Sequence, residues 1–189
     1  MNILEDSIIN GSELSVNALP HRTYSRCTLI ACNLQQADLK GKVFEDCVFQ
    51  KCDLSLAVVI HTSFRKVRFE HSKLLGLRFD QCHAFLLEVA FHHSILDLAN
   101  FHGLKLKKTM FDTCRLRETD LSTADLSGAI FKNCDLGAAL FDRTILEGAD
   151  LRTAQHYTID PSNNRIRKAR FSRDGLEGLL SSTGILIEN

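Results

Sequence analysis

The sequence predicts an all-β solenoid, a rod of stacked four-sided coils, and three observations support this fold class. A large apolar residue recurs every five positions, the residue two places before it is usually small, and like residues match best 20 apart. A spacing of five fits neither a straight strand, where side chains alternate, nor an amphipathic helix, which needs spacings of three and four. A bend in every repeat is therefore needed to keep the large residues inside.

The large residues, called centres below, fall into two frames. The first runs by fives from Leu14 to Phe79, and the second runs by fives from Leu86 to Leu151. Because Phe79 and Leu86 are seven positions apart, we expect a frame slip, with a bulge or small loop, near residues 80–86. At four centres per coil the two frames predict about seven coils, or ~34 Å of rod at ~4.8 Å per coil.

The number of sides follows from which residues stack. Phe91, Phe111 and Phe131 match at steps of 20, whereas steps of 15 mix Phe with Leu. Like residues stacked on like residues favour a coil with four sides over one with three.

The corners of the coils have a signature of their own. Five glycines lie two positions after a centre, where a tight corner benefits from freedom at positive φ; they are Gly41, Gly76, Gly103, Gly128 and Gly148. Asp and Asn side chains just before a centre point outward and can accept bonds from backbone N–H groups at the corner. These residues are Asn33, Asp38, Asp53, Asn100, Asp120, Asp125, Asp135 and Asp150.

The repeat resembles the pentapeptide repeat family, whose consensus A(D/N)LXX occurs as ADLKG at 37–41, ADLSG at 124–128 and ADLRT at 149–153. The resemblance covers residues 14 to 153. It implies a right-handed quadrilateral parallel β-helix. We therefore expect an N-terminal cap at 1–13, the β-helix at 14–153, and a C-terminal cap and dimerisation segment with a short helix at 154–189.

Composition and motifs argue against catalysis. Lys and Arg number 23 and so do Asp and Glu, so the net charge is zero. We find no nucleophile elbow, phosphate loop or HExxH motif, and a filled interior leaves no cleft, so we expect no enzyme and no cofactor. An acidic start and the lack of a long apolar run favour a cytoplasmic protein without membrane contact.

Cysteine and histidine do not indicate a metal site. Six of the cysteines stand two positions before a centre, and pairs such as Cys27 and Cys47 are 20 apart, so we expect small buried thiols. Without a CxxC pair a zinc site is unsupported. The histidines fall outside the core positions, and we interpret them as solvated.

Charge becomes uneven near the C-terminal end of the rod. Residues 112–150 carry eight acidic and four basic side chains, and eight minus four leaves a net charge of −4. The acidic residues are Asp112, Glu118, Asp120, Asp125, Asp135, Asp142, Glu147 and Asp150. A basic cluster follows at 165–173; it either contacts nucleic acid or complements the acidic coils, and we favour the second interpretation.

The tail contains an apolar helix and strand suited to covering the rod end. Ser172 is placed to cap a short helix, and GILIE follows at 184–188. The exposed apolar side chains predict a dimer contact formed by Leu176, Leu179, Leu180, Ile185 and Ile187.

Residues 158–188 and 55–79 are similar to the topoisomerase-poison resistance group of the family, namely the Qnr, albicidin-resistance and microcin B17 immunity type. The resemblance implies a homodimer joined at its C-terminal ends, with an acidic surface that engages DNA gyrase or topoisomerase IV, and no direct contact with nucleic acid. Our leading hypothesis is therefore a non-catalytic, DNA-mimic-like protein that protects a topoisomerase from a poison. The alternative is an interaction scaffold for an unrelated protein, using outward apolar residues such as Ile130, Leu140 and Ile145.

Overall fold

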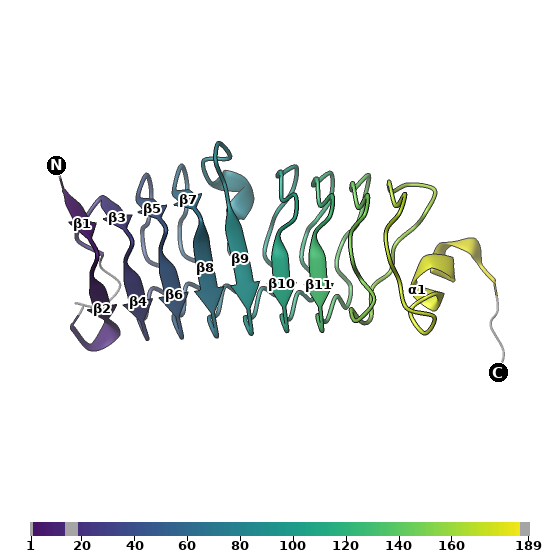
Figure 1. Ribbon diagram of the computed structural model, residues 1–189, viewed down its shortest axis with the longest axis horizontal. Coiled ribbons are helices and arrows are strands. Elements are labelled where there is room, and N and C mark those ends of the chain that lie inside the picture. Colours follow the sequence, from purple (N-terminus) through teal and green to yellow (C-terminus); the bar gives the residue numbers. More distant parts are fainter. Residues whose placement is uncertain (1, 14–18, 186–189) are drawn as a thin grey trace.

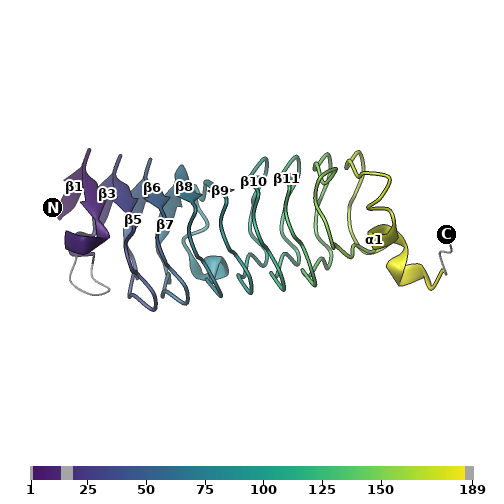
Figure 2. The same cartoon turned by 90° about the horizontal axis from the view of Figure 1, so that it is seen from below.

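The computed structural model describes residues 2–13 and 19–185 and shows a parallel β-solenoid. The coils stack into an elongated rod with the two chain termini at opposite ends (Figure 1). The same rod turned by 90° shows the coils following one another along its length (Figure 2). The predicted solenoid is confirmed.

Two sides of the coils form continuous parallel sheets. The four-stranded sheet contains β1 (Ile3–Glu5), β3 (Thr23–Ser25), β5 (Val43–Glu45) and β7 (Ser63–Arg65) in that order. The seven-stranded sheet contains β2 (Ile8–Asn10), β4 (Thr28–Ile30), β6 (Val48–Gln50), β8 (Val67–Glu70), β9 (Val89–His92), β10 (Met110–Asp112) and β11 (Ile130–Lys132). The other two sides are held by single parallel bridges, such as Asn33 with Asp53 and Asn100 with Asp120.

The corners explain why each coil has four sides. Arg26, Ala31, Gln36 and Gly41 follow at five-residue steps and all have φ between 52° and 62°. The predicted corner position, two residues after a centre, is therefore confirmed. Most corners carry a residue other than glycine, however, and at each such residue the left-handed conformation destabilises the fold by roughly 1–2 kcal/mol. The packed core and the coil-to-coil hydrogen bonds must offset that cost.

The core is a set of stacked columns. The side chains of Phe91, Phe111 and Phe131 have no exposed area, and their ring centroids lie 5.2 and 4.8 Å apart along the column. A second column holds Tyr24, Phe44 and Phe64. Small residues such as Ala124 fill the positions beside these columns, as the pattern predicts. Buried aromatic columns of this kind supply the hydrophobic stabilisation of the rod.

The frame slip is a bulge, but its centre is not where the sequence pattern placed it. Val67 pairs with Val89, so this coil has 22 residues rather than 20. A 3-10 helix at Phe79–Gln81 opens the bulge, which projects from the rod beside β9 (Figure 1). Leu86 was expected in the core, and this prediction is wrong: its side chain is 56% exposed. Leu87 packs against the core instead, because the two extra residues shift the inward position along the chain.

The stacked coils extend beyond the expected boundaries at 13/14 and 153/154. β1 pairs with β3 and β2 with β4, so residues 2–13 belong to the first coil. At the other end Arg165 bridges Ile145, and Arg170 bridges Asp150. The stack continues past Pro161, where the buried side chain of Asn164 accepts the Thr144 N–H at 2.8 Å.

The C-terminal helix is shorter than its sequence pattern indicates. α1 covers only Glu177–Leu180 and continues into a 3-10 turn at Ser181–Thr183; another 3-10 turn lies at Gly11–Glu13. Ser172 accepts the Gly175 N–H at 3.1 Å in the turn before the helix, so the expected capping residue acts one turn earlier. Within residues 2–13 and 19–185, no helix has the length and apolar character needed to cross a bilayer.

Candidate interaction surfaces

The Asp and Asn residues before the centres have a structural role. Each of the eight accepts a hydrogen bond from the backbone N–H two residues further on, as in Ser55 to Asp53 and Ser122 to Asp120, both at 2.9 Å. These bonds hold the chain as it turns from one side of the coil to the next. The predicted turn support is therefore confirmed, and each side chain has only part of its acceptor capacity left for a partner.

The eight acidic residues of 112–150 do not form one surface. The bridge pattern puts two of them on each side of the coils, counting a corner residue with the side before it. The residues that share a side are Asp112 and Asp150 on the first, Glu118 and Asp135 on the second, Asp120 and Asp142 on the third, and Asp125 and Glu147 on the fourth. A net charge of −4 along the sequence is thus divided around the whole rod.

Most of these carboxylates also have a positive partner. Within the described residues, only Glu118 among the eight lacks an ion pair or a histidine within 4.0 Å. The shortest contacts for the others are Asp112 to Lys132 at 3.1 Å, Asp120 to His102 at 4.0 Å, Asp125 to Lys107 at 3.2 Å, Asp135 to Arg117 at 2.6 Å, Asp142 to Arg143 at 3.1 Å, Glu147 to Arg165 at 2.8 Å and Asp150 to Arg152 at 2.7 Å.

The pKa is lowered for five of these carboxylates, namely Asp112, Asp125, Asp135, Asp142 and Asp150. The hydrogen bond from Lys132 holds the pKa of Asp112 below its ordinary value, and Arg152 does the same for the pKa of Asp150. Burial alone would raise the pKa of Asp135, but hydrogen bonds from His156, Arg117 and the Gly137 N–H, together with the Arg117 charge, lower it on balance. A basic partner protein must therefore displace internal cations to reach these oxygens.

The basic cluster joins the acidic coils only in part. Arg165 binds Glu147 at 2.8 Å, and Arg170 approaches Asp150 at 3.8 Å, which agrees with the interpretation favoured from the sequence. Arg167, Lys168 and Arg173 are exposed and have no ion pair within the described residues. The C-terminal end of the rod is therefore richer in unpaired cations than the sequence analysis expected.

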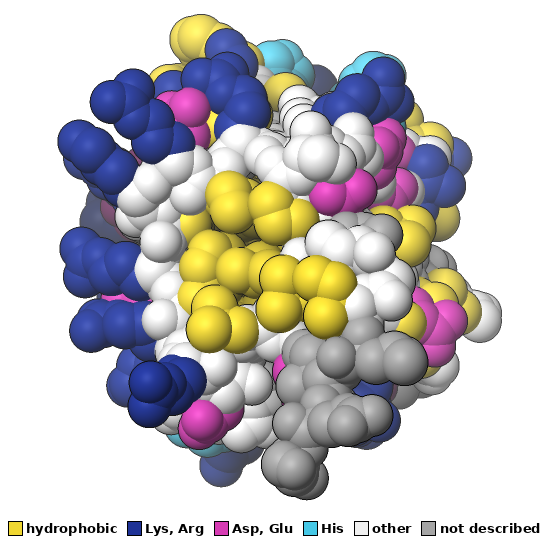
Figure 3. Space-filling view, turned by 90° about the vertical axis from the view of Figure 1, so that its right-hand side faces the viewer, with side chains coloured by type: hydrophobic (Ala, Val, Ile, Leu, Met, Phe, Trp, Pro, Cys, Tyr) yellow, Lys and Arg dark blue, Asp and Glu magenta, His cyan; other side chains and the backbone are white. Residues whose placement is uncertain are grey.

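The C-terminal end face is apolar at its centre. Figure 3 looks onto this end and shows hydrophobic side chains gathered in the middle, with Lys and Arg along one edge. Among the predicted dimer residues, Leu176 is 46% and Ile185 58% exposed, Leu179 and Leu180 are half-buried, and Ile187 lies outside the described residues. Leu179 packs against the core, so only part of the predicted set is free to contact a second molecule.

The residues that suggest chemistry are structural. All seven cysteines are free and buried, and burial raises the pKa of the Cys47 thiol to about 11. His71 and His93 stack on each other at neighbouring corners, with ring centroids 4.8 Å apart. In the part of the chain that the structure describes, no three His, Cys, Asp or Glu side chains are placed to hold a metal ion.

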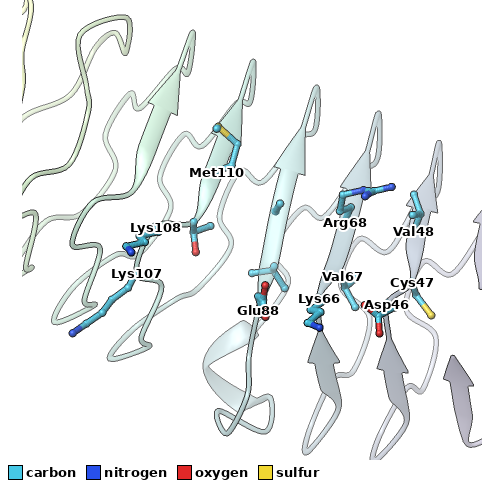
Figure 4. A pocket seen from close by; sticks show the side chains of 13 residues that line it. Asp46, Cys47, Val48, Lys66, Val67, Arg68, Glu88, Lys107, Lys108 and Met110 are labelled. Atoms are coloured by element: carbon cyan, nitrogen blue, oxygen red, sulfur yellow. The ribbon is translucent and has the colours of Figure 1, made fainter. Parts of the chain in front are cut away.

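A shallow groove follows one corner in the middle of the rod. It has a volume of ≈ 640 Å³ and lies between two rows of side chains (Figure 4). One row contains Asp46, Lys66, Glu88 and Lys108, and the other contains Val48, Arg68, Ala90 and Met110. The sequence analysis missed this groove, because the residues of each row are 20 or 22 positions apart.

A four-sided parallel stack with a core filled by side chains defines a β-solenoid repeat protein. A family model described as a pentapeptide repeat region matches residues 62–141. A second one, described as pentapeptide repeats in eight copies, matches residues 27–65. The chain belongs to the pentapeptide repeat family.

Two solved structures have the same fold as this chain. Two trypsin-treated variants of QnrB1, a plasmid-mediated fluoroquinolone resistance protein, match with 17% identity and TM-scores of 0.63 and 0.61. The matches cover 98% and 99% of this chain and 97% and 99% of the others. HetL of the cyanobacterium Nostoc matches with 18% identity, 89% and 84% coverage and a TM-score of 0.41. No curated protein sequence matches the chain.

Proposed function

We propose that this chain is a non-catalytic binding protein that engages DNA gyrase or topoisomerase IV and protects the enzyme from a topoisomerase poison. The observation that carries the proposal is a closed rod with the fold of QnrB1 over almost its full length, ending in an apolar face. Two such rods joined at this face form a long straight body whose outer surface is available to a large partner.

The distribution of carboxylates shapes the proposed mechanism. Asp112, Asp120, Asp125 and Asp135 lie on four different sides of the rod, so an enzyme channel that surrounds the rod meets a carboxylate on each side. Duplex DNA likewise presents negative charge around its whole circumference. Because the carboxylates are held by internal cations, we expect binding to be weak in high salt and to depend on exchange of ion pairs.

The direct test is a supercoiling and decatenation assay with purified gyrase and topoisomerase IV, with and without a panel of poisons. We expect the protein to restore activity in the presence of at least one poison. A quadruple variant carrying Asp112→Asn, Asp120→Asn, Asp125→Asn and Asp135→Asn should lose this effect while circular dichroism shows a folded rod, because Asn keeps the oxygen that accepts the turn N–H, as Asn33 and Asn100 do. Unchanged protection by the folded variant would remove the carboxylates from the mechanism.

The dimer contact is tested separately by sedimentation. Replacing Leu176 and Ile185 with Glu should convert a dimer to a monomer, because both side chains are exposed and neither is among the residues packed against the core. A wild-type protein that sediments as a monomer at micromolar concentration contradicts the end-to-end arrangement.

A second candidate function is a scaffold for an unrelated protein. Leu140 is 56% exposed, and Ile130 and Ile145 are half-buried, which gives the C-terminal half outward apolar residues on several sides. Recovery of another protein, with no topoisomerase, by immobilised wild type but not by a Leu140→Asp variant would favour this function.

A further inference from the structure

The first row of the groove has an alternating charge pattern. Asp46, Lys66, Glu88 and Lys108 follow one another on successive coils, because Val48 pairs with Arg68, Val67 with Val89, and Phe91 with Phe111. Neighbouring coils are about 4.8 Å apart. The row therefore presents negative, positive, negative and positive charges in turn, and Figure 4 shows the four side chains following one another from coil to coil.

These four side chains are available to a partner. All four are exposed, and none forms an ion pair within 4.0 Å in the described part of the chain. Towards the N-terminus Arg26, one coil away from Asp46, and Asp6, two coils away, continue the alternation but bind each other at 2.6 Å. The row of unpaired charges thus has four members, which is an even number.

The bulge keeps the row in phase. With two extra residues in the coil, the left-handed corner residue is Leu86 at φ 62°, but the place beside Lys66 is taken by Glu88, since the Val67 N–H donates to the Glu88 carbonyl at 2.9 Å. A continuous 20-residue period from Lys66 would have placed the apolar Leu86 and Leu106 next in the row and ended the alternation of charge.

The second row of the groove supplies apolar surface. Val48, Ala90 and Met110 are half-buried and stand beside the charged row, with Arg68 between them. Arg68 is 3.4 Å from Glu70 and so already has a partner.

When a row of alternating charges has an even number of members and is turned end to end, each negative charge faces a positive charge of the original row. When a second copy is placed antiparallel by a two-fold rotation, Asp46 faces Lys108 and Lys66 faces Glu88. The two spacings are identical because both rows come from the same coils. The apolar row also matches itself, with Val48 opposite Met110.

We propose that this groove is a lateral self-association surface, on which two rods lie side by side and antiparallel. A nucleic acid meets Asp46 and Glu88, and a wholly acidic or wholly basic peptide meets two like charges, so none of these occupants matches the row. A second copy of the chain matches the row in both sign and spacing. This contact is separate from the C-terminal end face and does not depend on the topoisomerase proposal.

The contact is expected to be weak. A strip two side chains wide is narrower than a stable interface, which buries about 800 Å² per partner. Exposed charges are screened over about 10 Å at 0.1 M salt. We therefore expect reversible association at high protein concentration and low ionic strength, decreasing steadily as salt is added.

Two charge variants test the arrangement. Lys66→Glu with Lys108→Glu makes the row wholly acidic, and Asp46→Lys with Glu88→Lys makes it wholly basic. By sedimentation velocity at low salt, each variant alone should lose the salt-sensitive species of the wild type. An equimolar mixture of the two should recover it, because the acidic row then faces the basic one. Any association through the end face is present in all four samples, namely the wild type, each variant and the mixture, and cancels in the comparison.

Controls separate self-association from folding and from net charge. Lys40→Glu with Lys51→Glu gives the same change in net charge on other parts of the rod and should associate as the wild type does. Thermal unfolding monitors each variant, since like charges on neighbouring coils repel within one rod. If the folded acidic and basic variants associate no more when mixed than alone, or if both retain the wild-type species, the proposal is wrong.

Discussion

The substitution Phe111→Ala tests the stacked core directly. Phe111 has no exposed area and lies between Phe91 and Phe131, with ring centroids 5.2 and 4.8 Å away. It also meets the edge of Phe101 at 6.2 Å. Truncation empties one position of a column whose neighbours are held by the coils above and below, so the cavity has little room to collapse.

The expected loss is at the upper end of the range for such substitutions. Replacing a buried Phe by Ala costs about 3–5 kcal/mol. The two stacked and one edge-on aromatic contacts are worth about 0.5–1.5 kcal/mol each beyond buried area. We therefore expect a decrease of about 4–5 kcal/mol in the free energy of unfolding.

Urea unfolding followed by circular dichroism measures this change, and Phe85→Ala is the matched control. Phe85 is 68% exposed on the bulge, so the same chemical change should stay within about 0.5 kcal/mol. Lys107→Ala, on the outside of the rod, should stay within the same limit. Equal effects of Phe111→Ala and Phe85→Ala would refute the assignment of inside and outside.

Three further predictions follow from the corners, the carboxylates and the thiols. Gly148 has φ +67° with no atom near an added Cβ, so Gly148→Ala should cost about 1 kcal/mol from backbone strain alone, while Glu118→Gly, at φ 56°, should gain about 0.5 kcal/mol in the same urea assay. Because the pKa values of Asp112 and Asp150 are lowered in the fold, these ionised carboxylates stabilise the folded state at any pH above their ordinary pKa of about 3.9. This stabilisation is lost as the pH falls through their lower pKa values in the fold. The urea midpoint should therefore be constant from pH 7 to about 5 and decrease below about pH 4, and the decrease should be less steep in Asp112→Asn. The Cys47 thiol, with a pKa of about 11, should react with iodoacetamide at pH 7.5 only in denaturant, as mass spectrometry can show.

The core and the corners were predictable from the sequence because both depend on short spacings. A centre such as Phe111 and its small neighbour at position 109 are fixed within one repeat, and the match to position 131 fixes the number of sides. Turn support by Asp120 was predictable for the same reason, since its hydrogen bond reaches only two residues along the chain.

The limits of the rod and the position of the bulge centre were harder to predict. At the C-terminal end Asn164 continues the stack through a polar side chain, which a pattern of apolar centres does not contain. Within the bulge, residues 86 and 87 are both leucine, so the residue type does not show which of them faces inward. The pairing of Val67 with Val89 decides this, and it directs Leu87 toward the core.

The charges show why the interaction surface could not be read from the linear sequence. In a coil of 20 residues, neighbours along the chain turn onto different sides, whereas neighbours in space are a full coil apart. The acidic excess of 112–150 therefore spreads around the rod, and residues one coil apart, such as Asp112 and Lys132, bind each other. Where such ion pairs form, the two charges compensate each other, and a partner's side chain meets no net charge. Where the column alternates without pairing, as from Asp46 to Lys108, it keeps charges that a partner can use. Recognition by this rod must therefore be sought in columns across the coils, and the variants that test it must change a column as a unit.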